Sequence, residues 1–520
     1  MTAWDASHPG IRRLRAGQGD GVRPRRTMSG DEAVSPGASR RQQANARVLQ
    51  LVDERVDHER MMERHQPVSV GWNLLGLRID ADGAFAFALF LPLLFMVQLG
   101  MLGAALVAAL VPLYVFVRRE RLIRTLLPRL FLFLIPALAL FSVLWSQAPK
   151  ETFKTAIEFG LTVMAGLLLS SARDQGAVIK GLALAFFTYV ASAFALGGAV
   201  QIGSAAGVQA FSGLTASKNL LGDIAAAGLI ISIATVMLGV RRKQPLWVLL
   251  GGSAILLDLY VVLAARSAGA LLGVGMSAGA MIALSTLLPA PRALRGFLTA
   301  AVALCLIGAG LSYRWLTETL ITTGAQIFDK DPTLTGRTYL WYRANDLIAE
   351  KPLLGRGYEA FWIQGNIDAE GLWRYFGIEE RGGFTFHNTA VELLVSLGWV
   401  GLILSGAVAV VGAVFLVRRF VEKPSIALVC WMSLFLYMAA RTPIETIGIS
   451  PFYFSTCLAF AALGAAFGRV KLPRRAHSYR APGVIDLKPV DYSVAGWANM
   501  RAAPAPGSLR LLRPAAPGRS

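Results

Sequence analysis

The chain has 520 residues, of which 55% are hydrophobic and only 16% are charged, and its mean hydropathy is +0.52. This composition is too apolar for a soluble multidomain protein and indicates a polytopic membrane protein. The formal net charge of +19 would favour nucleic acid binding in a soluble protein, but much of it lies in polar tails and in short loops between apolar segments. That is the positive-inside pattern of membrane proteins, so we expect no nucleic acid partner.

The first part of the chain, residues 1–83, is expected to be a basic cytoplasmic tail. Most of it is rich in Gly, Pro, Ser and Arg, with too few apolar residues to offset the entropy of folding, and is expected to be disordered. Residues 41–64 differ, because they lack Gly and Pro and place Val48, Val52 and Val56 at helical spacing among charges. They predict a cytoplasmic helix that lies on the membrane surface or pairs with a partner.

Apolar segments follow one another from residue 84 to residue 467. A spanning helix needs about 20 apolar residues, and somewhat shorter ones can also span. We therefore expect an all-α polytopic membrane protein with about twelve transmembrane helices, at residues 84–99, 101–117, 126–144, 155–171, 177–200, 219–240, 246–264, 268–288, 296–313, 389–417, 425–440 and 449–467. Residues 84–313 thus contain helices 1 to 9, and residues 387–467 contain helices 10 to 12.

Basic residues alternate with loop parity, which predicts the orientation of the chain. One set of loops carries Arg118, Arg119, Arg121, Arg124, Arg173, Lys180, Arg241, Arg242, Lys243, Arg292, Arg295, Arg418, Arg419 and Lys423. The first tail and the second basic tail, residues 468–520, fall on the same side, so both termini are expected in the cytoplasm. The opposite loops are poor in cations apart from residues 314–386, which we expect to form a periplasmic loop with short amphipathic helices.

Three cations at the outer membrane boundary are informative because that face is otherwise poor in them. Lys218 begins a span, Arg266 follows one and Arg441 ends one. A cation is costly there without an anionic partner, and a diphosphate is a natural one, since guanidinium groups bind phosphate in a bidentate way. The alternative is a set of internal ion pairs, Arg266 with Asp258, Lys218 with Asp223 and Arg441 with Glu445.

Within the outer segment, the stretch that begins with Gly336 and Arg337 predicts an amphipathic periplasmic helix over the bundle. Apolar residues fall on one side of it, and a proline and a glycine end it: Leu340, Leu347, Ile348, Pro352 and Gly355. Arg337 is expected to point into the space beneath this helix, and Arg356 is a further cation of the same segment.

The chain then predicts a tight turn back toward the membrane. Gly355 and Gly357 permit such a turn, and Tyr358, Phe361 and Trp362 are suited to the membrane interface. The segment would thereby return the chain to the bilayer ahead of the next span.

His387 is the only one of the five histidines in the apolar body of the chain. It precedes Thr389 and Glu392, whose spacing predicts a capping box at a helix start. A neutral imidazole is favoured near the positive end of a helix, and it can accept a proton from a hydroxyl. The alternative is that His387 only caps or packs. No metal site is expected, because no second histidine or cysteine lies on this side.

Several stretches of the chain resemble the landmarks of one protein family. The first runs from His387 and Asn388 through a spacer over residues 389–397 to Gly398 and Gly401. It resembles the histidine signature of the O-antigen ligase superfamily, H[NSQ]x9Gxx[GTY]. The stretches FSVLWSQAPKETFK, TASKNLLGD, ARSAGALL and the block from GRTYLW to PLLGRGYEAFW are similar to the other landmarks of the family. One departure is that a landmark often reading His-Lys-Asn is here Ser217, Lys218 and Asn219, which excludes a second catalytic histidine at that place.

The resemblance implies an inner-membrane glycosyltransferase that moves a glycan from an undecaprenyl-diphosphate donor to a periplasmic acceptor. It would act as an exopolysaccharide or O-antigen polymerase or as an O-antigen ligase, with an acceptor glycan or lipid A core as acceptor. The implied mechanism uses no metal and no cofactor: His387 helps to activate the acceptor hydroxyl, and Arg266 and Arg337 hold the diphosphate. Substrate binding is expected of Lys218, Arg441, Asn388 and Arg356.

Two other functions are alternatives. A transporter or flippase of lipid-linked glycans tends to place substrate charges near the bilayer midplane and to show repeated halves, whereas here the charges gather at the outer boundary and no internal repeat is found. A protein O-oligosaccharyltransferase often carries a further large periplasmic domain after the core, whereas the chain after Phe467 is short and basic. The resemblance in TASKN and ARSAGALL favours exopolysaccharide polymerases.

Overall fold

The computed structural model describes residues 71–74, 77–201, 209–215, 217–311, 336–379, 381 and 383–467. The expected basic tails, apart from a short stretch that ends the first one, lie outside these ranges. The helix expected at residues 41–64 and residues 314–335 of the expected periplasmic loop lie outside them too. The chain divides into two units after Gly71, and all the helices described below belong to the second unit.

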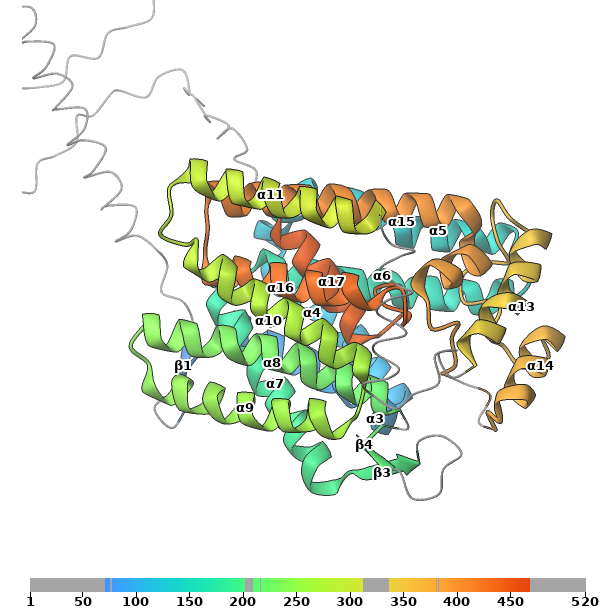
Figure 1. Ribbon diagram of the computed structural model, residues 1–520, viewed down its shortest axis with the longest axis horizontal. Coiled ribbons are helices and arrows are strands. Elements are labelled where there is room, and N and C mark those ends of the chain that lie inside the picture. The colour runs from blue at the N-terminus through green and yellow to red at the C-terminus, as the bar shows by residue number, and fades with distance from the viewer. Residues whose placement is uncertain are drawn as a thin grey trace, which may run out of the picture. The chain divides into compact units, whose positions relative to one another are not determined.

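The described part of the chain is mostly helical. The helices are α2 (Ala81–Leu94), α3 (Met96–Leu99), α4 (Met101–Leu126), α5 (Leu134–Phe141), α6 (Pro149–Ser171), α7 (Gln175–Leu196), α8 (Lys218–Arg241), α9 (Pro245–Ala264), α10 (Ala268–Thr286), α11 (Arg292–Leu311), α13 (Arg337–Glu350), α14 (Ile367–Phe376), α15 (Thr389–Glu422), α16 (Ile426–Arg441) and α17 (Phe454–Ala465). Two 3-10 helices, η1 (Leu127–Phe133) and η2 (Ser142–Leu144), flank α5. Figure 1 shows the long helices roughly aligned, with α13 and α14 at one end.

Among the described residues, 8 helices are long and apolar enough to cross a membrane. They are Met101–Arg119 of α4, the η1 to η2 stretch Leu127–Leu144, and α6, α7, α8, α9, α10 and α15, and the shorter apolar helices α2, α16 and α17 accompany them. Every expected span contains a helix, so the all-α polytopic class is confirmed. How many of these helices cross the membrane, and that the loop faces the periplasm, stay predictions.

Several boundaries differ from the expected ones by a few residues, and two of them lie next to short strands. α2 begins at Ala81 because the side chain of Asp80 accepts a hydrogen bond from the backbone of Asp82, and two short strands, β1 (Gly71–Leu74) and β2 (Leu77–Asp80), pair just before it. The span expected to run to residue 200 ends at Leu196, and β3 (Gly198–Gln201) then pairs antiparallel with β4 (Gln209–Gly213). Gly197 allows this, since a Cβ there would lie 2.4 Å from the Cα of Gly213.

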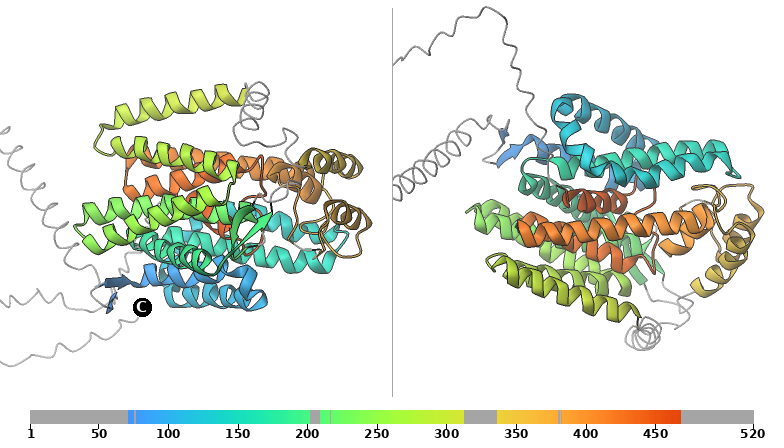
Figure 2. Two further views of the ribbon diagram at one scale, coloured as in Figure 1. Left: turned by 60° about the horizontal axis from the view of Figure 1, so that its bottom comes forward. Right: turned by 90° about the horizontal axis from the view of Figure 1, so that it is seen from above.

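The buried apolar residues form three clusters. The largest joins α2, α7, α8, α16 and α17, and a second joins α5, α6 and α15. The third lies under α13 and α14 and includes Leu340, Leu347, Trp373 and Phe386. The expected amphipathic helix is therefore confirmed as α13, with its apolar side buried. Figure 2 shows α15 running along the bundle toward the α13 and α14 end.

The long helix α15 contains a break that positions its first turns. Gly398 has a φ of 65° and a ψ of −164°, which interrupts the helix after nine residues, Thr389 to Leu397. The chain before the break meets the expected tight turn: Arg356 and Gly357 donate backbone hydrogen bonds to the carbonyls of Val395 and Ser396. Beyond the break, Trp399 donates to the carbonyl of Pro352 at 2.9 Å.

Glycine is required on both sides of this joint. A Cβ on Gly398 would lie 2.3 Å from the backbone of Leu353, and one on Gly355 would lie 2.5 Å from the backbone of Ser396. Contacts below 3.0 Å with backbone cannot be relieved by a side-chain movement, so a larger residue would force the two segments apart. Gly398, the first glycine of the histidine signature, is therefore needed for close packing of these two segments.

The aromatic residues after the turn are placed differently from the expectation. Tyr358 and Phe361 are buried rather than lying at a membrane interface. The hydroxyl of Tyr358 donates to the carbonyl of Ile449, and its ring stacks on Phe159 with centroids 5.3 Å apart. Phe361 packs against Trp362 and Phe386. The interface prediction is therefore wrong for these two, because the turn inserts them into the core instead of returning them to the bilayer surface.

Candidate active site

The start of α15 presents His387 in an unusual backbone conformation. Asn388 is the N-cap residue, and its Oδ1 accepts from the backbone N–H groups of Ala390 and Val391 at 2.9 and 3.2 Å. His387, just before it, has a φ of 49°, a left-handed conformation that costs a residue with a Cβ of the order of 1 kcal/mol. Such strain persists only where surrounding contacts fix it, so the contacts of His387 are informative.

The expected capping box of Thr389 and Glu392 is not formed. Because Asn388 already caps the helix, the hydroxyl of Thr389 donates instead to the carbonyl of Glu445 at 2.9 Å. The carboxylate of Glu392 accepts from the backbone N–H of Phe386 and from the indole of Trp362. The helix start was predicted correctly, but these two residues attach it to neighbouring segments.

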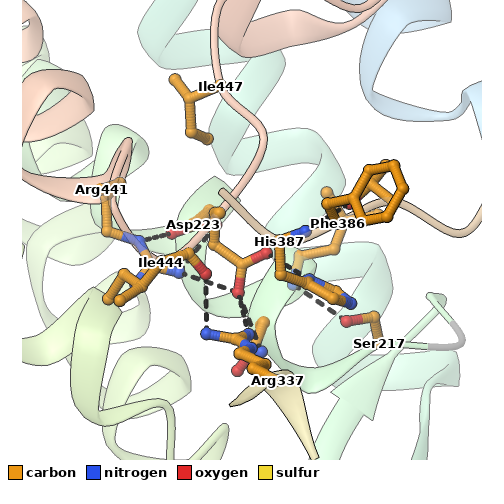
Figure 3. A network of polar contacts seen from close by, with 12 residues as sticks. Ser217, Asp223, Arg337, Phe386, His387, Arg441, Ile444 and Ile447 are labelled. Atoms are coloured by element: carbon orange, nitrogen blue, oxygen red, sulfur yellow. Dashed lines mark hydrogen bonds and ion pairs between the residues drawn. The ribbon is translucent and has the colours of Figure 1, made fainter. Parts of the chain in front are cut away.

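A single carboxylate, Glu445, connects the residues of the candidate site. One of its oxygens lies 2.9 Å from Nδ1 of His387. The other accepts from Nη2 of Arg337 at 2.8 Å and from the side-chain amide of Asn219 at 3.0 Å. Arg337 also donates to the carbonyl of Ile444 at 2.7 Å. Figure 3 shows His387 and Arg337 directed toward this centre from different elements.

The ionisation state of Glu445 fixes the tautomer of His387. Burial raises the pKa of this carboxyl, but the hydrogen bond from His387 and the positive charges around it lower the pKa to about 2. An ionised carboxylate only accepts hydrogen bonds, so Nδ1 of His387 carries the proton. Nε2 of a neutral ring is then unprotonated and can accept a proton.

Arg441 is buried and serves as a structural cation beside this centre. Its Nε donates to Asp223 at 2.7 Å, its Nη2 lies 3.6 Å from Glu445, and the hydroxyl of Tyr437 also donates to Asp223. The ion-pair alternative therefore holds for Arg441, with Asp223 as a closer partner than the expected Glu445. The missing side chain of Gly269 makes room, since a Cβ there would lie 1.9 Å from Nη1 of Arg441.

Lys218 and Arg266 lie at the starts of two helices that reach the same centre. Lys218 is the first residue of α8, and Asn219 next to it bonds to Glu445. Arg266 has a φ of 47° and precedes Ser267, whose hydroxyl donates to Asn219 at 3.0 Å. Asp258, the partner considered for Arg266, accepts from Ser232 at 3.1 Å. The hydrogen bonds from Ser267 to Asn219 and from Asn219 to Glu445 thus connect the starts of α8 and α10 to the carboxylate that contacts His387.

Six of the seven expected site residues are placed within or directly beside this network, and one has other contacts. His387, Arg337 and Arg441 belong to it, and Asn388 caps α15 next to His387. Lys218 and Arg266 adjoin residues of the network. Arg356 does not join it, because its guanidinium pairs with Glu350 and donates to Gln147, where it anchors the turn before α14.

Sequence reasoning missed the polar residues that link His387 to the predicted cations. Glu445 was considered only as a partner of Arg441, and Asp223 only as a partner of Lys218. Asn219 was named only as part of a family landmark, and Ser267 and Tyr437 were not singled out. The available signal was an acidic side chain just beyond the outer end of a span, the same boundary at which the cations were noticed. No group of three or more His, Cys, Asp or Glu side chains suited to a metal ion occurs in the part of the chain that the structure describes.

Comparisons with known proteins give a consistent result. A family described as "O-Antigen ligase" matches residues 253–406, a range from α9 to the middle of α15 that contains Arg266, Arg337 and His387. The chain is also 31% identical over 370 residues to "Exopolysaccharide production protein ExoQ" of Rhizobium meliloti (strain 1021). That match covers 70% of this chain and 82% of the relative. It extends well beyond the region that contains the histidine signature.

Proposed function

Because this chain belongs to the O-antigen ligase superfamily, we propose that it moves a glycan from an undecaprenyl-diphosphate donor to a periplasmic acceptor. The family makes it a multi-pass membrane enzyme of the O-antigen ligase or polysaccharide polymerase type. The similarity to an exopolysaccharide production protein favours a polymerase, for which the acceptor is a second glycan. We further propose that the protein lies in the inner membrane and that its active site faces the periplasm.

The observation that carries the proposal is the shared carboxylate. Glu445 binds His387 through one oxygen and Arg337 through the other, at 2.9 and 2.8 Å. This arrangement holds an unprotonated ring nitrogen and a phosphate-binding guanidinium in one fixed relation. A glycosyl transfer from a diphosphate needs a base and an anion-binding group at that proximity.

The donor would lie at the helix starts around Glu445. Lys218, Arg266, Arg337 and Arg441 bring cationic side chains to this region. A diphosphate suits bidentate binding by guanidinium groups. Arg441 is committed to Asp223, so Arg337, Arg266 and Lys218 are the side chains proposed to contact the phosphate oxygens.

The chemical step is a substitution at the anomeric carbon of the donor glycan. The acceptor hydroxyl forms a bond to that carbon while the bond from carbon to the diphosphate oxygen breaks. The hydroxyl proton passes to Nε2 of His387, and the diphosphate leaves with the bonding electrons next to the cations. Glu445 keeps the ring in the productive tautomer and stabilises the imidazolium that forms, in the way a carboxylate orients histidine in hydrolases.

Reconstituted transfer tests the proposal. The full chain in lipid nanodiscs would receive undecaprenyl-diphosphate-linked repeat units, alone or with lipid A core, and product length would be read on gels. We expect polymer from the donor alone, and a large loss with His387→Ala, Arg337→Ala and Arg266→Ala. Normal transfer by all three variants would refute the site. Movement of donor across the bilayer without any new glycosidic bond would instead support a transporter.

A further inference from the structure

An accessible row of aromatic rings leads outward from His387. The ring of Phe384 meets the imidazole edge to face, with centroids 5.6 Å apart, and Phe376 follows at 5.5 Å. Tyr375 lies 5.0 Å from Phe376, and Tyr339 lies 4.2 Å from Tyr375. We call Phe384, Phe376, Tyr375 and Tyr339 the aromatic row. It joins the candidate base to the tips of α13 and α14.

The outer half of the row is not needed for the core of this region. The buried cluster under α13 and α14 is built from other residues, and only Phe376 and Phe384 pack against its edge. The side chain of Tyr375 remains 63% exposed and that of Tyr339 36% exposed. Neither tyrosine hydroxyl bonds to any residue within the described ranges. Two large, partly exposed rings are thus held side by side.

The position of the row relates it to the acceptor rather than to the lipid. Figure 1 shows α14 at the end of the bundle, beyond the starts of α8 and α10. Gly336 fixes the junction, since a Cβ there would lie 2.8 Å from the ring of Phe376. The row therefore passes beside the start of α13 and ends at His387, the group that takes the acceptor proton. Of the cations proposed for the diphosphate, Lys218 lies at the start of α8, Arg266 lies just before α10, and Arg337 lies at the start of α13.

We propose that the aromatic row is a binding track for sugar rings of the acceptor glycan. The faces of aromatic rings carry negative partial charge and attract the C–H groups on the flat side of a pyranose, while the tyrosine hydroxyls can bond to sugar hydroxyls. A glycan lying along Tyr339, Tyr375 and Phe376 would deliver its terminal hydroxyl to Nε2 of His387. This inference rests on the proposed function, because it assigns a place to the acceptor of that reaction.

The track can be tested without turnover. The probes are free oligosaccharides of one, two and three repeat units, released by mild acid from the lipid-linked glycan of the bacterium that carries this chain. Binding to the full His387→Ala chain in nanodiscs would be measured by saturation-transfer NMR and calorimetry. We expect Kd to fall with oligosaccharide length, and Tyr375→Ala or Tyr339→Ala to raise the Kd of the longer probes about three- to tenfold, the worth of one ring contact.

Tyr342→Ala is a matched control, because Tyr342 lies on the same helix as Tyr339, is 63% exposed and makes no ring contact in the row. It should leave every Kd unchanged. In the active chain, Tyr375→Ala should raise KM for the acceptor and leave KM for the donor and kcat unchanged.

Equal affinities of the parent and both tyrosine variants would overturn the track. So would a loss of thermal stability in bilayers with unchanged Kd, which would make the tyrosines membrane anchors. The proposed function fails separately, if the unaltered chain forms no glycosidic bond. In that case, a tyrosine-dependent Kd for free oligosaccharide would still support a glycan-binding row.

Discussion

The arginines at the two ends of the helix bundle have different kinds of partner. At the end opposite the site, Arg129 and Arg419 donate to carbonyls at the end of α17, including those of Gly464 and Ala465. Arg295 donates to the carbonyl of Val421 near the end of α15. At the site end, Arg337 and Arg441 pair with the carboxylates Glu445 and Asp223.

This difference separates two roles that charge counting treats alike. A guanidinium that meets helix carbonyls satisfies groups that the helix leaves unpaired, so it supports the fold. A guanidinium that shares a carboxylate with a histidine is fixed in orientation next to that histidine. The positive-inside pattern predicts which end is cytoplasmic, but only the partners identify the end suited to an anionic substrate.

His387→Ala should produce the largest effect. It removes the group proposed to take the acceptor proton, and general base catalysis contributes roughly a hundredfold to ten-thousandfold to a rate. We expect transfer to fall by that range while thermal unfolding in detergent stays close to that of the parent chain, because the ring is 30% exposed. A variant that retains most of its transfer rate would remove the chemical distinction between the two ends.

Lysine replacements at the two ends sharpen the comparison. Arg337→Lys cannot reach Glu445, the carbonyl of Ile444 and a phosphate together, so transfer should drop about a hundredfold. Arg419→Lys is the matched control, since a lysine can still donate to the carbonyls of Ala465 and Phe467. Initial rates per folded molecule would be compared. Equal losses in both variants would contradict the division into fold-supporting and site arginines.

Arg129→Ala should affect stability and spare chemistry. The guanidinium is buried and donates to the carbonyls of Thr125, Gly464 and Phe467. Leaving those carbonyls unpaired should cost about 3 kcal/mol. The measurements are unfolding temperature and yield, together with the transfer rate of the fraction that folds. Unchanged stability would show that the helix ends find other donors.

Among the site variants, Glu445→Gln should have the smallest effect on transfer, about tenfold, because an amide oxygen can still accept from Nδ1 of His387. Its stability effect should depend on pH. The pKa of Glu445 is lowered in the folded chain, to about 2, so its stabilising contribution is complete above the unfolded pKa, about 4.3, and is lost as pH falls toward 2. The difference in Tm between parent and variant should stay constant above about pH 5 and shrink below it. A constant difference down to pH 3 would contradict this.

The sequence predicted the fold class and most helix positions because apolar length is a local property. It predicted α13 and its turn for the same reason, since Leu340, Leu347, Pro352 and Gly355 lie close together in the chain. It also selected His387 and Arg337. The ends of helices were predicted less accurately where a contact with a distant residue determines them, as in the contact of Gly197 with Gly213.

The network itself depends on pairings between distant residues. Glu445 contacts Asn219, which is 226 positions away in the chain, and Arg337, which is 108 positions away. The residues around Glu445, TPIETIG, give no local indication of these contacts. Tyr358 and Phe361 were misplaced at an interface for a related reason. An aromatic residue after a turn suits a membrane surface and a protein core equally well, and the joint with α15 decides between them.

The placement of the joint at Gly398 and of Glu445 bears on biosynthesis. Lys218, Arg266 and Arg337 are made first, then the turn at residues 352–357, then His387 with the helix that clasps this turn, and Glu445 follows after α16. On the proposed function, a nascent chain acquires the cations proposed for the phosphate well before the proposed base, and that base before Glu445. Competence for transfer would then arrive only when the last two apolar helices are being inserted.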